Sequence, residues 1–166
     1  MSNLRLINET TFSSVSTVNV TDVFSADYDI YKITYNGAGQ YGLLKFINSS
    51  GSVMSDASYD TARLNLKPNT SASETRVVGT DVGIYAFAES SGSGTGGNVL
   101  YIFNPNSSSS YTFVTAQTVD INSGTAHRIA KTIGVHKNAS SMSGFQLNAL
   151  ASVSGTMRTY GLRVDS

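Results

Sequence analysis

The sequence predicts an all-β fold: a single-domain antiparallel β-sandwich, jelly-roll-like, with about nine to eleven short strands. Three observations lead to this prediction. Apolar and polar residues alternate with a period of two in several segments. Ser, Thr, Asn and Gly supply 71 of the 166 residues, a composition that suits strands joined by turns. No stretch combines a helical period with capping residues, and at most one helical turn fits around residues 55–59.

The first residues of the chain are only weakly patterned. We therefore expect residues 1–17 to form an N-terminal arm that contacts another subunit or a larger particle, and residues 18–166 to form the sandwich. Five later segments are rich in aromatic and branched residues on both faces, which is typical of strands that are central in a sandwich or covered by a neighbouring subunit. They are residues 28–35, 42–47, 84–88, 99–103 and 111–116.

Other segments alternate, which is typical of half-buried strands with the apolar face inward. Their apolar positions are Ala62, Leu64 and Leu66; Ile129, Ile133 and Val135; Phe145, Leu147 and Ala149; and Tyr160, Leu162 and Val164. Arg63, Thr132 and His136 lie on the opposite, polar faces.

Turn residues separate these segments. Asn36-Gly37 predicts a tight hairpin, because both residues tolerate a positive φ. Residues 48–51 predict a slightly longer reversal. Asn104-Pro105 and Ser154-Gly155 are expected to interrupt strands. Residues 90–97, made only of Ser, Gly and Thr, are expected to form an exposed loop.

Composition argues against several classes of function. Eleven basic residues balance eleven acidic ones, so the chain lacks the clustered positive charge that binds nucleic acid. Without cysteine there are no disulfides, thiolate metal sites or cysteine nucleophiles. No apolar run approaches the roughly 20 residues needed to span a membrane, and no secretory signal is visible. We therefore expect synthesis in a cytoplasm and no partner among nucleic acids or membranes.

No residue pattern predicts catalysis. His127 and His136 lack the spacing of metal ligands or of a catalytic site, and we interpret both as ordinary surface or interface residues. The aspartates at 22, 27 and 29, and at 56 and 60, fit turn chemistry better than a calcium site. We expect no enzyme activity, no catalytic or metal-binding residues and no cofactor.

The chain does carry a signal for assembly. Strands with two apolar faces would leave aromatic surface exposed on a lone sandwich, and such patches usually mark interfaces. The alternative is that the two sheets and a covering loop bury both faces inside the monomer. Our candidates for contacts with a partner or with a second copy are Leu4, Leu6, Phe12, Tyr101, Phe103, Tyr111 and Phe113.

Four segments, in the same order, resemble a family of small virion structural proteins of tailed bacteriophages, especially cyanophages. They are residues 27–34 (DYDIYKIT), 44–53 (LKFINSSGSV), 101–113 (YIFNPNSSSSYTF) and 154–164 (SGTMRTYGLRV). The resemblance covers most of the chain from about residue 20 and rests on strand-and-turn patterns. It implies a β-sandwich without catalysis on a virion, and it carries over no site residues.

Together with the composition, the resemblance leads us to expect a capsid decoration (cement) protein. Such a protein would lie on the outside of an icosahedral head as a homo-oligomer, which we expect to be a trimer, and would be made in the cytoplasm of the bacterial host. Its main partner would be the major capsid protein. The alternative is a receptor-binding or adhesin domain of a tail fibre or spike, with residues 90–97 among its recognition loops.

Overall fold

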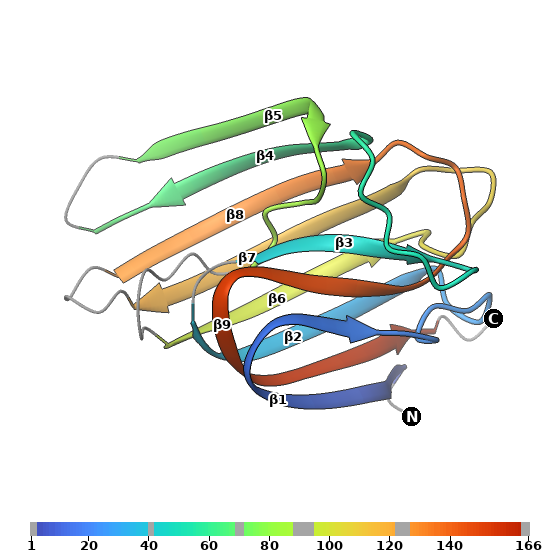
Figure 1. The fold of residues 1–166 in the computed structure, drawn as a ribbon, viewed down its shortest axis with the longest axis horizontal. Coiled ribbons are helices and arrows are strands. Elements are labelled where there is room, and N and C mark those ends of the chain that lie inside the picture. The colour runs from blue at the N-terminus through green and yellow to red at the C-terminus, as the bar shows by residue number, and fades with distance from the viewer. Residues whose placement is uncertain (1–2, 40–41, 69–71, 88–94, 122–126, 164–166) are drawn as a thin grey trace.

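The computed structural model describes residues 3–39, 42–68, 72–87, 95–121 and 127–163. These residues form nine antiparallel strands and no helix (Figure 1). The strands are β1 (Leu4–Val20), β2 (Ile30–Gly39), β3 (Gly42–Asn48), β4 (Tyr59–Leu66), β5 (Ser73–Asp81), β6 (Thr95–Phe103), β7 (Thr112–Ile121), β8 (His127–His136) and β9 (Met142–Leu162). The predicted all-β antiparallel sandwich is confirmed, although β1 and β9, with 17 and 21 residues, are not short.

Eight strands form one large sheet in the order β1-β9-β2-β6-β7-β8-β4-β5. Within it, β2 pairs along its whole length with β9 on one side and from Ile30 to Ala38 with β6 on the other. Asn36 and Gly37 lie inside both ladders, so the predicted hairpin at these residues is wrong. Partners on both sides hold the two residues in extended conformation, and this tertiary context overrides their turn propensity.

Strands β1 and β9 pass from the large sheet into a second layer. The part of β9 from Val153 onward pairs with β2 and with Leu4–Phe12 of β1. The part up to Ala149 pairs instead with β3 and with Thr17–Val20 of β1. Breaks in the register of β1 accompany this transition, as expected where bulges bend a strand. Figure 1 shows β3 and the first half of β9 lying over the large sheet, which makes the two layers of the sandwich.

The N-terminal segment is part of this architecture. The predicted boundary between an arm of residues 1–17 and a domain of residues 18–166 falls inside β1. Residues of β1 on both sides of that boundary pair with β9 of the same chain. The predicted break at Ser154-Gly155 also falls inside a strand, close to the point where β9 changes layer.

The core lies between the two layers and contains many aromatic side chains. The ring of Phe24 meets Tyr31 edge-on, with 4.7 Å between centroids, and lies 6.5 Å from Phe46 and 6.0 Å from Phe145. Tyr31, Phe46 and Phe145 are completely buried. Because a buried aromatic side chain removes about 150–250 Å² from water, this cluster is a main source of the attraction between the layers.

The predicted strand at residues 84–88 is instead an irregular segment in its described part. Ile84 forms an isolated bridge to Leu44 of β3, with backbone hydrogen bonds of 2.8 and 2.9 Å in the two directions. The Thr132 hydroxyl of β8 donates to the backbone carbonyl of Tyr85 at 2.9 Å. This segment therefore extends the second layer and covers the inner face of β8.

Two of the predicted turns are confirmed. The Gly51 amide donates to the Asn48 carbonyl at 3.0 Å, and Gly51 has a φ of 82°. Strand β6 ends at Phe103, and Asn104, which follows it, has a φ of 57°. No helical turn forms at residues 55–59, where irregular chain leads into β4. Residues 90–94 of the predicted loop lie outside the described residues, and Thr95–Gly97 belong to β6.

The predicted inward face of β4 is wrong. Arg63 and Asn65 are buried in the inner face of the sheet, whereas Leu64 and Leu66 are 38% and 40% exposed. The same holds for β8, in which Thr132 and His136 are buried while Ile129 and Ile133 are 41% and 62% exposed.

In the second half of β9, Thr159 is buried and Tyr160 is only partly covered. The prediction is correct in the first half of β9, where Phe145 and Leu147 are buried. Val164 lies outside the described residues. Some of the apolar side chains in these alternating segments therefore lie on the outer face of the large sheet.

Candidate functional site

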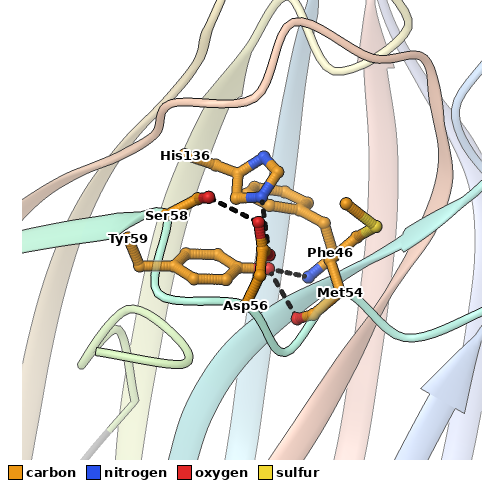
Figure 2. Close-up of polar contacts among 6 residues, drawn as sticks. All are labelled: Phe46, Met54, Asp56, Ser58, Tyr59 and His136. Atoms are coloured by element: carbon orange, nitrogen blue, oxygen red, sulfur yellow. Dashed lines mark hydrogen bonds and ion pairs between the residues drawn. The ribbon is translucent and has the colours of Figure 1, made fainter. Parts of the chain in front are cut away.

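Two parts of the molecule have features of a functional site: a buried histidine beside β3 and the outer face of the large sheet. Figure 2 shows the first, where residues 54–58 pass over the end of β8. The His136 ring is completely buried and lies 4.5 Å from the Tyr59 ring and 5.7 Å from the Phe46 ring, between centroids. The interpretation of His136 as a surface or interface residue is therefore wrong, because the polar-looking side of β8 faces the core.

Polar groups lie on one side of this histidine. The Nε2 atom of His136 lies 3.7 Å from an oxygen of Asp56, which is too long for a hydrogen bond. The Ser58 hydroxyl donates to the other oxygen of Asp56. The Tyr59 hydroxyl donates to the Met54 carbonyl and accepts from a backbone amide of β3, both at 3.0 Å.

The electrostatics of this cluster favour a neutral imidazole. Burial lowers the pKa of His136, and the nearby Asp56 carboxylate opposes that shift only in part. The hydrogen bond from Ser58 holds the pKa of Asp56 below its usual value. Burial raises the pKa of Tyr59 above its usual value of 10.0. All three groups are therefore in their ordinary ionisation states at neutral pH.

The arrangement does not match a nucleophile activated by a base. Such a site needs the imidazole within hydrogen-bond reach of the hydroxyl. Here Asp56 lies between Ser58 and His136, and the Ser58 proton is directed at the carboxylate. The chemistry that this geometry supports is local anchoring of residues 54–58 to β3 and β8.

The aspartates at 22, 27 and 29, and at 56 and 60, are not grouped with further metal-ligating side chains in the described part of the chain. Among the described residues, no three His, Asp or Glu side chains are grouped so that they could hold a metal ion. The described part of the chain also contains no helix long and apolar enough to cross a membrane.

The second candidate is the outer face of the large sheet, where directly paired residues form rows across the strands. One row at one end of the strands is apolar over six strands. Its members, in order of pairing, are Leu4, Leu162, Ile30, Phe103, Phe113 and Val135. The next row is mixed and consists of Leu6, Tyr160, Lys32, Tyr101, Thr115, Ile133, Ala62 and Arg76.

Toward the other end of the strands, apolar residues recur on this face. Val119 of β7 pairs with Ile129 of β8, which pairs with Leu66 of β4. Their side chains are 54%, 41% and 40% exposed. The described residues of the chain place no second layer over this side of the sheet, so its apolar side chains contact water in the isolated chain.

The structure places five of the seven predicted contact residues in the first two rows of this outer face: Leu4, Leu6, Tyr101, Phe103 and Phe113. Tyr111 is exposed directly before β7. Phe12 differs, because its ring stacks on Tyr35 with 5.8 Å between centroids and packs against the core. Bulges in β1 change which residues face the core, which a strict alternation cannot predict.

Sequence reasoning missed the contribution of β4 and β8 to this face. Leu64, Ile129 and Ile133 were expected in the core but are exposed. The alternation separates the two faces of each strand correctly, yet it does not identify the inner one. The interrupting Lys131 among the isoleucines of β8 was the one sequence signal that this face meets solvent.

Several shallow hollows lie on the outer face. One, of about 380 Å³, is bordered by Leu64, Glu74, Arg76 and Lys131 among others. Two others lie side by side. The first, of about 450 Å³, is apolar and is bordered by Phe113, Ile133, Val135, Ala62 and Val78 among others. The second, of about 390 Å³, is bordered by Lys32, Tyr101, Gln117, Lys131 and Ile133 among others. Thr115 and Ile133 belong to both, so the outer face combines an apolar groove with an adjoining polar one.

A scan against protein-family models found no match to this sequence, and a search of curated proteins found none.

Proposed function

We propose that this chain is a non-enzymatic structural protein of a tailed-bacteriophage particle, and that it serves as a capsid decoration protein on the outside of the icosahedral head. The observation that carries the proposal is the outer face of the large sheet. An antiparallel sheet with a solvated face normally alternates apolar inward and polar outward. Here the solvated face holds a six-residue apolar row.

The size of this face suits a specific interface. Eight strands about 4.8 Å apart span roughly 34 Å, and the rows from Phe113 to Val119 cover about 20 Å along the strands, since each strand residue rises about 3.4 Å. The product, about 700 Å², is close to the roughly 800 Å² that each partner contributes to a standard interface. A sheet face of this size fits an extended surface such as a shell of repeated subunits.

The physical role of such a protein follows from linkage. A chain that binds the assembled shell but not its free subunits stabilises the shell, and many copies multiply the effect. A net charge of zero allows neighbouring copies to lie close together without repulsion. The expected trimer remains a prediction, which sedimentation of the purified chain would test.

The experiment that tests the proposal is immunogold electron microscopy of purified particles from the phage that encodes this chain. Label spread over the head, at hundreds of copies per particle, is the expected result. Label confined to the tail or its appendages would instead favour the receptor-binding alternative. Particles without any label would contradict both.

A further inference from the structure

The polar hollow on the outer face has an unusual distribution of charge. Lys32 on β2 pairs directly with Tyr101 on β6, while Lys131 on β8 pairs with Gln117 on β7. Both lysines border the same hollow, with Thr115 between their strands. Each of these polar side chains can donate a hydrogen bond, and the two ammonium groups can donate hydrogen bonds but cannot accept them.

The other charged side chains described on this face form ion pairs within the chain. Arg158 forms an ion pair with Glu9 at 2.5 Å, and Arg76 forms one with Glu74 at 2.6 Å. Asp60 is held by Lys137 at 2.9 Å. Lys32 and Lys131, by contrast, have no ion-pair partner among the residues that the structure describes. The two lysines without an ion pair therefore border one hollow, and Lys131 also borders the hollow that contains Glu74 and Arg76.

We propose that the surface covering this face carries carboxylate groups that bind Lys32 and Lys131, beside an apolar side chain that fills the groove between Phe113 and Val78. This inference rests on the proposed function, because it takes the shell as the covering surface. Covering the face with a purely apolar surface would bury two ammonium groups without partners, which is strongly unfavourable. A carboxylate accepts hydrogen bonds and donates none, so it matches the donors that line the hollow.

A second copy of this chain does not meet the requirement. The acidic residues described on the outer face are Glu9, Asp60 and Glu74, and each is engaged by a cation of its own chain. Two copies stacked face to face would bring no free carboxylate to either lysine.

Nucleic acid is also a poor match. A phosphate backbone is bound by a series of cations along its path. This face offers two unpaired lysines on a chain of zero net charge. An acidic protein surface is therefore the partner that fits both the charge and the apolar groove.

The test measures co-sedimentation of the purified chain with empty shells assembled from the major capsid protein alone, between 50 and 500 mM NaCl. Wild-type binding should weaken by about tenfold or more over this range, because the lysine contacts are screened. The double variant K32Q/K131Q should bind about tenfold or more weakly at low salt and lose most of the salt dependence. K32R/K131R, which keeps both charges, should bind nearly as the wild type does.

Lys67→Gln is the matched control, because it removes one lysine that lies outside the strands of the outer face; its binding should be unchanged. Circular dichroism of each variant checks that it is folded. If K32Q/K131Q bound shells as tightly as the wild type and with the same salt dependence, the inference would be overturned. That would hold even if Ile133→Ser abolished binding and so supported the outer face as the docking surface. Tight binding of the wild type to duplex DNA, lost in K32Q/K131Q, would also overturn it. Failure of the wild type to bind shells would contradict the proposed function, and the inference with it.

Discussion

The backbone of Gly134 in β8 packs directly against the side chain of Ile84. A Cβ atom added to Gly134 would lie 2.6 Å from Cγ2 of Ile84 and 2.9 Å from two further atoms of the same side chain. Ile84 is completely buried and is held by its two backbone hydrogen bonds to Leu44. The segment around Ile84 thus approaches β8 as closely as a residue without a side chain allows.

This contact predicts that Gly134→Ala destabilises the fold. Because the buried Ile84 side chain cannot move away freely, the expected loss in the free energy of unfolding is about 1–3 kcal/mol, as for other overpacked cores. Urea unfolding followed by circular dichroism measures the loss. Gly97→Ala is the control, since a Cβ at Gly97 meets no atom within 4 Å, and it should change stability by less than about 0.5 kcal/mol. Equal effects of the two substitutions would contradict the packing described for Gly134.

The contact also explains why the inner and outer faces of β8 were misassigned. A backbone segment covers the inner face, so that face holds the small residues Ala130, Thr132 and Gly134. The larger side chains of Ile129 and Ile133 lie on the outer face instead. Alternation predicted the strand itself correctly, because its period of two is a local property. The identity of the inner face depends on what packs against it, which is not local.

The turns show the same limit, because a local preference for a turn does not decide whether the turn forms. Gly51 and Asn104 adopt positive φ values in turns that the sequence predicted. Asn36 and Gly37 have the same local preference but lie in a strand with partners on both sides. Of the outer face, the aromatic contribution of Tyr101, Phe103 and Phe113 was predictable from strands that are apolar on both sides. The contribution of β4 and β8 to the outer face was not predictable from the sequence.

A second prediction concerns pH. Burial lowers the pKa of His136 in the folded protein below its usual value of 6.5. As the pH falls through about 6.5, the unfolded chain takes up a proton that the folded chain does not, so the free energy of unfolding decreases. The decrease should begin below about pH 7 and continue until the lower pKa of the folded state is reached.

Urea unfolding at intervals between pH 7.5 and pH 5 measures this effect. His136→Leu should show a smaller decrease over the same range, because the titrating group is gone. The Asp56 carboxylate acts at lower pH: its pKa is lowered on folding, so its contribution is lost below about pH 4. His127→Gln, a change at the exposed start of β8, should keep the wild-type pH dependence. A wild-type profile in His136→Leu would contradict the assignment.

A third prediction concerns the Tyr59 hydroxyl. This buried group accepts from the Phe46 amide and donates to the Met54 carbonyl, so it joins β3, β4 and the intervening loop. Tyr59→Phe removes both hydrogen bonds and leaves a buried amide without this partner, at an expected cost of about 1–3 kcal/mol. Thermal unfolding measures the cost. Tyr111→Phe, which removes an exposed hydroxyl, should leave the melting temperature unchanged. A cost below about 0.5 kcal/mol for Tyr59→Phe would mean that water replaces the lost partner.

The fourth prediction tests directly which face of the large sheet is outside. Ile102 on β6 is completely buried, whereas Ile133 on β8 is 62% exposed. Ile102→Ala should therefore cost about 2–5 kcal/mol, because it leaves a cavity in the core. Ile133→Ala, with the same change in side chain, should cost less than about 1 kcal/mol, because most of its surface is already in water. Urea unfolding of the two variants under one set of conditions gives the comparison. If Ile133→Ala were as costly as Ile102→Ala, the isoleucine face of β8 would be buried in solution and the outer face could not be free to bind a shell. The expected difference would instead leave the apolar rows of that face available to a partner, so that their substitution should weaken binding far more than folding.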